Sequence, residues 1–146
     1  MKYRIEKMTL EDLAMGVIEV LRGVPILGYF EEELPLIRES IKDPRAIMLV
    51  AKDDSKPQVL GFLIGGISAV RGHINHIATN PRYKEELKGQ GIGESLLKSS
   101  EAWFLEQGCT RLLLDTAAEN RAAAAFFAYQ GWKEPPGERH FQKDLK

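Results

Sequence analysis

The chain contains a single cysteine, Cys109, among its 146 residues. One cysteine cannot form a disulfide within the chain, and it provides no thiolate cluster that could bind a structural zinc ion. Its neighbours, Gly108 and Thr110, indicate a small buried residue at the start of a strand, which is commoner for a free cysteine than a nucleophilic role. From the sequence we expect no metal site.

An excess of charge is also missing, since 20 Lys and Arg residues stand against 21 Asp and Glu residues, a formal net charge of -1. A surface that binds nucleic acid normally shows a clustered basic excess, so we expect no nucleic-acid partner. Residues 1–6 contain no apolar run long enough for a signal peptide or a membrane span. We therefore expect a cytoplasmic protein without membrane contact, and the length predicts one domain over residues 1–146.

What the chain does contain is a glycine-rich run at residues 88–93 (KGQGIG), called the glycine loop below, between a strand-like segment and an amphipathic helical pattern. Glycines let the backbone approach an anion, and the first turn of a helix offers unpaired N–H groups. The run is therefore either a phosphate-binding loop or an ordinary strand-to-helix connection. A Walker A loop would need Gly-Lys-Ser/Thr, which is absent, and a dinucleotide fingerprint fits less well because Glu94 replaces a small residue.

Periodicity and turn residues predict alternating strands and helices along the chain. Thr9 with Asp12 is typical of a helix N-cap, Pro25 interrupts the helical pattern, and Gly65-Gly66 marks a bulge or bend. Residues 53–57 read as the turn of an antiparallel hairpin. We expect strands over residues 2–7, 46–52, 58–70, 72–80 and 111–116, a last strand or strand pair over 132–145, and helices over 10–21, 29–41, 92–107 and 120–131.

Three landmarks follow one another in the second half of the chain: segment 74–81 (INHIATNP), the glycine loop, and the spaced residues Asn120, Ala123, Phe127, Gly131 and Trp132. Together they resemble the signature of the GNAT superfamily, the CoA-dependent N-acyltransferases, whose loop reads Gln/Arg-x-x-Gly-x-Gly/Ala. The resemblance implies an α/β (α+β) fold with a mixed, mostly antiparallel central sheet of six to seven strands flanked by about four helices. Lys88 stands where the family usually has Gln or Arg, and Phe127 where many members have tyrosine.

The same resemblance implies acetyl-CoA as cosubstrate, held where the strand that ends at Thr79 diverges from the strand at residues 112–114. Backbone groups of the first strand would bind the pantetheine, and the glycine loop would bind the diphosphate. The cofactor-binding residues that follow from it are Ile77, Ala78, Thr79, Lys88, Gly89, Gln90, Gly91, Ile92, Gly93, Asn120 and Phe127.

Two histidines, His73 and His76, lie on the strand beside the expected acyl group and are candidates for the catalytic base, because imidazole titrates in the useful range. Their separation predicts opposite faces of the sheet. We favour His73, because some family members carry a base near that point, and a packed strand histidine is the alternative for both. Tyr129 should point away from the cofactor, and His140 should lie on the surface.

The function that the resemblance implies is transfer of an acetyl group from acetyl-CoA to a primary amine, by direct attack in a ternary complex. The acceptor, a small molecule or a peptide, is not encoded in a readable way. The alternative is a non-catalytic acyl-CoA-binding regulatory or interaction module, which Phe127 and Asn75 make worth considering. Trp132 and Phe141 are candidates for a homodimer contact, and each is equally typical of a core residue.

Overall fold

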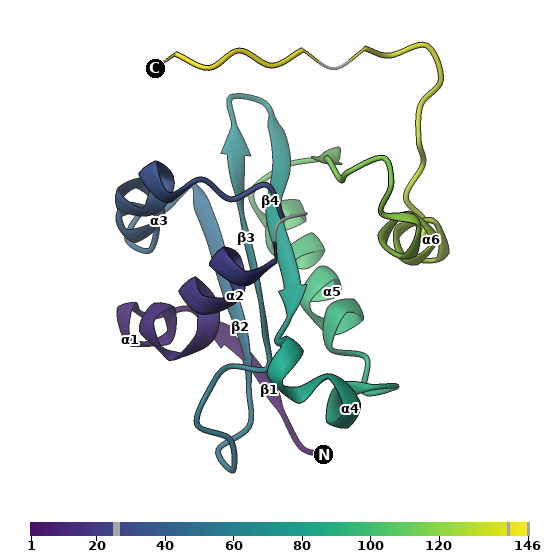
Figure 1. The fold of residues 1–146 in the computed structure, drawn as a ribbon. Helices are drawn as coiled ribbons and strands as arrows, with labels where there is room; N and C mark the ends of the chain where they lie inside the picture. Colours follow the sequence, from purple (N-terminus) through teal and green to yellow (C-terminus); the bar gives the residue numbers. More distant parts are fainter. Residues whose placement is uncertain (25–26, 140, 146) are drawn as a thin grey trace.

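The computed structural model describes residues 1–24, 27–139 and 141–145. Pro25, expected to interrupt a helix, and His140, expected on the surface, lie outside these residues. In Figure 1 a twisted sheet lies between helices, and the C-terminal residues run away from this body as an extended segment.

A five-stranded sheet forms the centre of the described part of the chain, with its strands in sequential order. Neighbours pair antiparallel from the first strand to the fourth, and the fourth and fifth pair in parallel. This mixed, mostly antiparallel sheet confirms the predicted fold class, and the hairpin around residues 53–57 is confirmed with it. The strands are β1 (Arg4–Lys7), β2 (Ala46–Lys52), β3 (Gly61–Ser68), β4 (Arg71–Thr79) and β5 (Leu112–Leu114).

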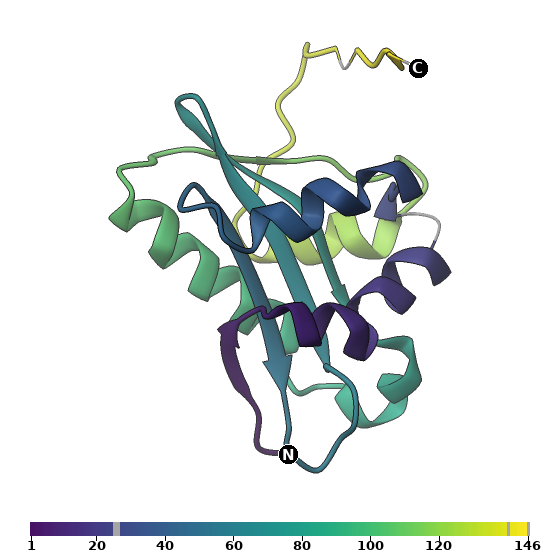
Figure 2. The same cartoon turned by 90° about the vertical axis from the view of Figure 1, so that its left-hand side faces the viewer.

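Helices lie on both faces of this sheet (Figures 1 and 2). The first three α-helices cover one face, and the long α5 covers the other. The last helix, α6, lies on the α5 side, where its phenylalanines join the same apolar cluster. The helices are α1 (Leu10–Asp12), α2 (Ile18–Gly23), α3 (Leu34–Ser40), α4 (Lys84–Leu87), α5 (Ile92–Glu106) and α6 (Arg121–Tyr129).

Two apolar clusters, one on each face, hold these layers together. Strand β2 contributes to both, because successive side chains point to opposite faces: Met48 and Val50 pack under α2, and Ile47 and Leu49 pack under α5. Full burial of a large aliphatic or aromatic side chain stabilises the fold by about 1.5–3 kcal/mol. The alternating apolar pattern therefore fixes which side of the sheet each helix occupies.

The first helix begins as predicted and then breaks. Thr9 Oγ accepts the N–H of Asp12 at 3.2 Å, and the Asp12 carboxylate accepts the N–H of Thr9 at 2.9 Å, which confirms the cap. Met15 and Gly16 leave the helical conformation, and the C=O of Met15 accepts the N–H of Val59 at 3.0 Å. One continuous helix over residues 10–21 is therefore wrong, because a bond to a distant segment replaces an intrahelical one.

The expected last strand is also wrong. Within the described residues, 132–145 form no strand, so the sheet has five strands instead of six to seven. Pro135 and Pro136 have no N–H to donate to a ladder. The side chains of residues 133–139 and 141–145 are exposed, while Trp132 packs against Phe127 at 5.9 Å. With so little apolar burial, little offsets the entropy cost of ordering a strand.

Candidate functional site

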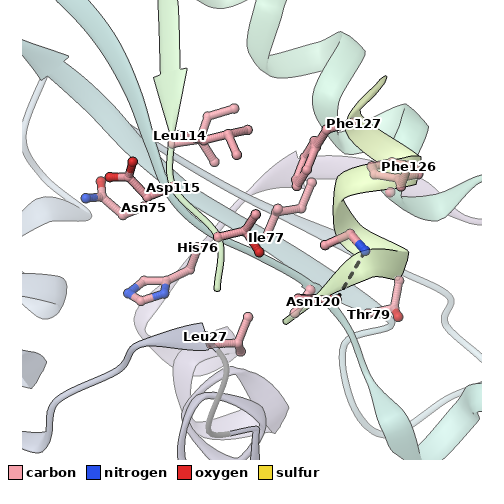
Figure 3. A pocket seen from close by; sticks show the side chains of 15 residues that line it. Leu27, Asn75, His76, Ile77, Thr79, Leu114, Asp115, Asn120, Phe126 and Phe127 are labelled. Carbon is pink, nitrogen blue, oxygen red and sulfur yellow. Dashed lines mark hydrogen bonds between the residues drawn. The ribbon is translucent and has the colours of Figure 1, made fainter. Parts of the chain in front are cut away.

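The sheet opens between β4 and β5. These strands pair only from Gly72 with Leu112 to Ile74 with Leu114, after which β4 continues to Thr79 paired with β3 on its other side. A cavity of about 290 Å³ lies at this divergence (Figure 3). The residues that line it are Leu27, Ile74, Asn75, His76, Ile77, Ala78, Thr79, Gly93, Leu114, Asp115, Thr116, Asn120, Ala123, Phe126 and Phe127.

A β-bulge in β4 sets which side chains face this cavity. The register shifts between Ile64, which pairs with His76, and Gly65, which pairs with Ile74, so Asn75 is the extra residue. A Cβ on Gly65 would lie 2.6 Å from the backbone oxygen of His73, so this approach requires glycine. The bulge predicted from the glycine pair is therefore confirmed.

The bulge overturns the expectation that the two histidines lie on opposite faces. His73 pairs with Gly66 and His76 with Ile64, and these partners are two residues apart on β3, on one face of the sheet. Both imidazoles therefore belong to the face covered by the first three helices. Only His76 lines the cavity.

His76 is almost fully buried, with 8% of its surface exposed, and it lines the cavity together with Leu27 (Figure 3). Its Nδ1 has no hydrogen-bond partner among the described residues. Burial lowers the pKa of His76, and a backbone contact with Leu27 and the charge of Glu33 oppose this shift only in part. The lowered pKa favours the neutral form of the imidazole at pH 7.

His73 lies just outside the lining set, beside the carboxylate of Asp115. Its Nε2 is 3.7 Å from Asp115 Oδ2, and both side chains are partly exposed, at 31% and 66%. Asn75 also lies next to Asp115 at the cavity (Figure 3). This places an anionic group and an amide at the wall nearest to His73.

Strand β4 presents an open edge to the cavity. On the side of β3, Asn80 donates its N–H to the C=O of Leu60 at 2.7 Å. The C=O of Ala78 points the same way, 2.8 Å from where a Cβ on Gly61 would lie. Because backbone groups alternate in direction along a strand, those of Ile77 and Thr79 point the other way. Beyond Ile74 no strand of the described residues pairs with that edge. A ligand with amide groups can therefore form backbone hydrogen bonds with this edge of β4, as a further strand would.

The end of β4 is tightly held by Asn80, which is 4% exposed. Its side-chain amide donates to the C=O of Val59 at 2.9 Å and to Gln58 Oε1 at 3.2 Å, and its Oδ1 accepts the N–H of Arg82 at 3.0 Å. All polar groups of this side chain are used, so the strand end is fixed to the segment before β3.

The glycine loop leads into α5 as predicted. Gly89 and Gly91 have left-handed backbone conformations, with φ of 75° and 71°, and Gly91 is the N-cap of this 15-residue helix. The first intrahelical bond joins the N–H of Ser95 to the C=O of Gly91 at 2.9 Å, so the preceding N–H groups have no helical partner. Of the loop residues only Gly93 lines the cavity; Ile92 is buried in the core.

The cavity is closed on the α5 side by α6. The Oδ1 atom of Asn120 accepts the N–H of Ala123 at 3.1 Å and caps the helix. Phe126 and Phe127 meet edge to face at 5.3 Å, and a Cβ on Gly93 would lie 3.2 Å from the ring of Phe126. Tyr129 is 87% exposed and does not line the cavity, as predicted from the helical spacing.

Several lining residues were not singled out in the sequence. Phe126 could have been predicted from the sequence, because it directly precedes Phe127, the aromatic residue of the family spacing. Two adjacent aromatic residues on one helix can both border the same cavity. Nothing in the sequence marks Leu27 or Thr116 as a lining residue, because each comes from an irregular segment that only the fold brings next to β4.

Residues 1–24, 27–139 and 141–145 contain no group of three or more His, Cys, Asp or Glu side chains that could hold a metal ion. No helix among them is both long and apolar enough to cross a membrane.

Comparison with known proteins gives a family match. The model of a family described as acetyltransferase (GNAT) matches residues 15–132. An uncharacterized N-acetyltransferase of Methanocaldococcus jannaschii is 30% identical over 86 residues, which are 58% of this chain and 51% of the relative. The chain therefore spans about half the length of the curated relative that it matches.

Solved structures share the fold. The aminoglycoside 6′-N-acetyltransferase AAC(6′)-Ih of Acinetobacter baumannii has a TM-score of 0.74 at 20% identity, with 99% of this chain and 100% of the other covered. The PaiA N-acetyltransferase of Thermoplasma acidophilum, in complex with coenzyme A, has a TM-score of 0.75 at 22% identity, with 94% of each chain covered. At these identities the likeness concerns the fold alone.

Proposed function

The chain belongs to the acetyltransferase (GNAT) family, and we propose that it transfers an acetyl group from acetyl-CoA to a primary amine, by direct attack of the amine in a ternary complex. The observation that carries this proposal is the divergence of β4 from β5, where one cavity is bordered by an open strand edge, the start of α5 and a buried histidine. Acetyl-CoA, when bound, supplies the thioester as an activated acyl group.

The described residues fit such a ligand. The unpaired backbone groups of Ile77 and Thr79 suit the amides of a pantetheine arm, and the N–H groups at the start of α5 suit a diphosphate. Phe127 and Asn120 border the region between them. Lys88 is exposed at the loop and adds a positive charge, although without the planar fork of an arginine.

We propose His76 as the group that takes the proton from the attacking amine. A protonated amine cannot attack, and a buried, neutral imidazole that lines the cavity is suited to accept its proton. The Nδ1 atom of this ring has no hydrogen-bond partner among the described residues, so no such bond holds it in one protonation state. His73 remains the second candidate, acting at the Asp115 side of the cavity.

The remaining chemistry depends mainly on positioning. The aromatic ring of Phe127 lines the cavity but has no proton to donate, so this chain offers no tyrosine hydroxyl at that point of α6. Holding two reactants together in a productive geometry lowers the barrier without any acid group. The acceptor wall is formed by Leu27, Asn75, Asp115 and Thr116, and we propose a small-molecule or peptide amine as the acceptor.

The test is release of free CoA thiol from acetyl-CoA in the presence of a pooled library of primary amines. Release that requires both protein and amine supports the proposal. His76→Gln keeps a polar side chain but cannot take up a proton, so the rate should fall by about 10²–10⁴-fold, while CoA affinity changes little.

His73→Gln is the matched control, because His73 is on the same face of the same strand but outside the cavity lining. A larger loss in this variant than in His76→Gln would transfer the role to His73. Tight binding of acetyl-CoA with no thiol release from any amine would instead favour an acyl-CoA-binding regulatory module.

A further inference from the structure

The hydroxyl of Tyr3 lies at the entrance of α5, although this residue comes from the opposite end of the sequence. Its Oη is 3.1 Å from the C=O of Gln90, 3.3 Å from the C=O of Gly91 and 2.7 Å from Oγ of Ser95. The ring of Tyr3 packs, partly buried, against the apolar cluster under α5. One phenol therefore contacts the end of the glycine loop and the first turn of the helix together.

These contacts determine where the N–H groups of the loop point. In a trans peptide the C=O and the N–H of one unit point in opposite directions. A carbonyl of Gln90 held toward Tyr3 therefore turns the N–H of Gly91 away from Tyr3, and the carbonyl of Gly91 does the same for Ile92. The phenol has one hydrogen for these carbonyls and can also accept a hydrogen from Ser95.

The loop needs such a constraint because its own residues provide little. Gly89 and Gly91 are both left-handed, and a Cβ placed on Gly89 would meet nothing within 4 Å. Glycines carry the largest backbone entropy, so an unsupported loop would lose affinity when it orders around an anion.

We propose that Tyr3 is a positioning residue for the diphosphate of acyl-CoA, whose hydroxyl fixes the N–H groups of Gly91 and Ile92 toward the ligand. This role rests on the proposed function, since it requires CoA at the glycine loop. It predicts that Tyr3 contributes to binding of the diphosphate and not to binding of the pantetheine arm.

Tyr3→Phe tests this role, because it removes the hydroxyl and keeps the ring in the apolar cluster. Calorimetry should show a Kd for CoA about 3–10-fold higher, in keeping with the loss of one hydrogen bond. A titration of the protein with pantetheine, which lacks the diphosphate, followed by NMR, should give the wild-type Kd. Ser95→Ala, which removes the other hydroxyl, should raise the Kd for CoA by a smaller factor and serves if Tyr3→Phe does not fold.

Tyr83→Phe is the matched control, because the Tyr83 hydroxyl accepts the N–H of Gln58 at 3.2 Å, in a different part of the structure. Its Tm should fall without a change in CoA affinity. Wild-type CoA affinity in Tyr3→Phe, or an equal loss for CoA and pantetheine, would overturn the inference. If the wild-type protein bound neither ligand, the proposed function itself would fail, and the role of Tyr3 with it.

Discussion

Replacing Gly91 by alanine, beside the same replacement of Gly89, tests whether the glycine loop binds the diphosphate. Both residues have a left-handed backbone with nearly the same φ, 71° at Gly91 and 75° at Gly89. A Cβ at Gly91 would meet only the hydroxyl of Tyr3, at 4.0 Å, and a Cβ at Gly89 would meet nothing within 4 Å. Neither alanine is blocked by a neighbour. Each substitution should therefore lower the free energy of unfolding only through the side chain in the left-handed region, by about 1–2 kcal/mol.

The two variants should therefore lose the same free energy of unfolding and differ in CoA affinity. Gly91 is the N-cap of α5, directly before the unpaired N–H groups, whereas Gly89 lies two residues earlier. Backbone strain at Gly91 tilts those groups, and each weakened hydrogen bond to a charged oxygen contributes about 1.5–3 kcal/mol, or about 10–100-fold in Kd. For Gly89→Ala the Kd should stay within about threefold of wild type.

Thermal unfolding followed by circular dichroism gives the first quantity, and isothermal titration calorimetry with acetyl-CoA gives the second. Alanine is the better probe here, because the β-branched valine is strongly disfavoured at a positive φ and would test folding more than binding. If Gly91→Ala showed the expected loss of stability and bound acetyl-CoA as wild type does, the loop would not be the diphosphate site.

Three other predictions concern the histidine, the aromatic wall and the packing of the sheet. Burial lowers the pKa of His76 below its ordinary 6.5, so below that pH unfolding takes up a proton. The contribution of His76 to the free energy of unfolding is therefore full above pH 6.5 and is lost as the pH falls below it. His76→Gln should reduce the slope of Tm against pH between pH 7 and 5, and an unchanged slope would contradict this. Phe127→Tyr places a proton donor at the cavity and should raise the maximal rate of CoA thiol release; an unchanged rate across the amine library would count against an acid at this position. A Cβ on Gly72 would lie 2.4 Å from Leu112, so Gly72→Ala should cost about 1–3 kcal/mol in urea unfolding, while Gly23→Ala, with nothing within 4 Å, should cost nothing.

The features predicted correctly from the sequence are those with local causes. The cap at Thr9 depends on residues three positions apart, and the hairpin over 53–57 depends on turn residues. The exposed position of Tyr129 follows from helical geometry alone. The left-handed conformation of Gly91 also has a local cause, because glycine permits it, whereas binding of a diphosphate by this loop stays a prediction.

The features predicted wrongly depend on contacts between distant segments. The break at Gly16 arises where the chain packs tightly on the residues just before β3 and just after β4: a Cβ there would lie 3.3 Å from Gln58, Val59 and Asn80. The faces of His73 and His76 depend on which strand receives the extra residue of the bulge. The glycines that mark the bulge are on β3, whereas the extra residue, Asn75, is on β4, so counting along one strand could not show it.

The two walls of the cavity, β4 and α6, differ in how firmly they are attached to the rest of the fold, and the hydrogen bonds of Asn80 contribute to this difference. Strand β4 is paired to β3 along its length and tied down at its end, so this wall is stiff. The opposite wall is α6, which has no fully buried residue and rests on the body through Phe126 and Phe127. We therefore expect a change in cavity width to move α6 and to leave the backbone edge of β4 in place. For the proposed acetyl transfer we therefore expect α6 to set the tolerance for acyl groups of different length and β4 to set how firmly the thioester is held, so that substitutions in α6 alter the first without the second.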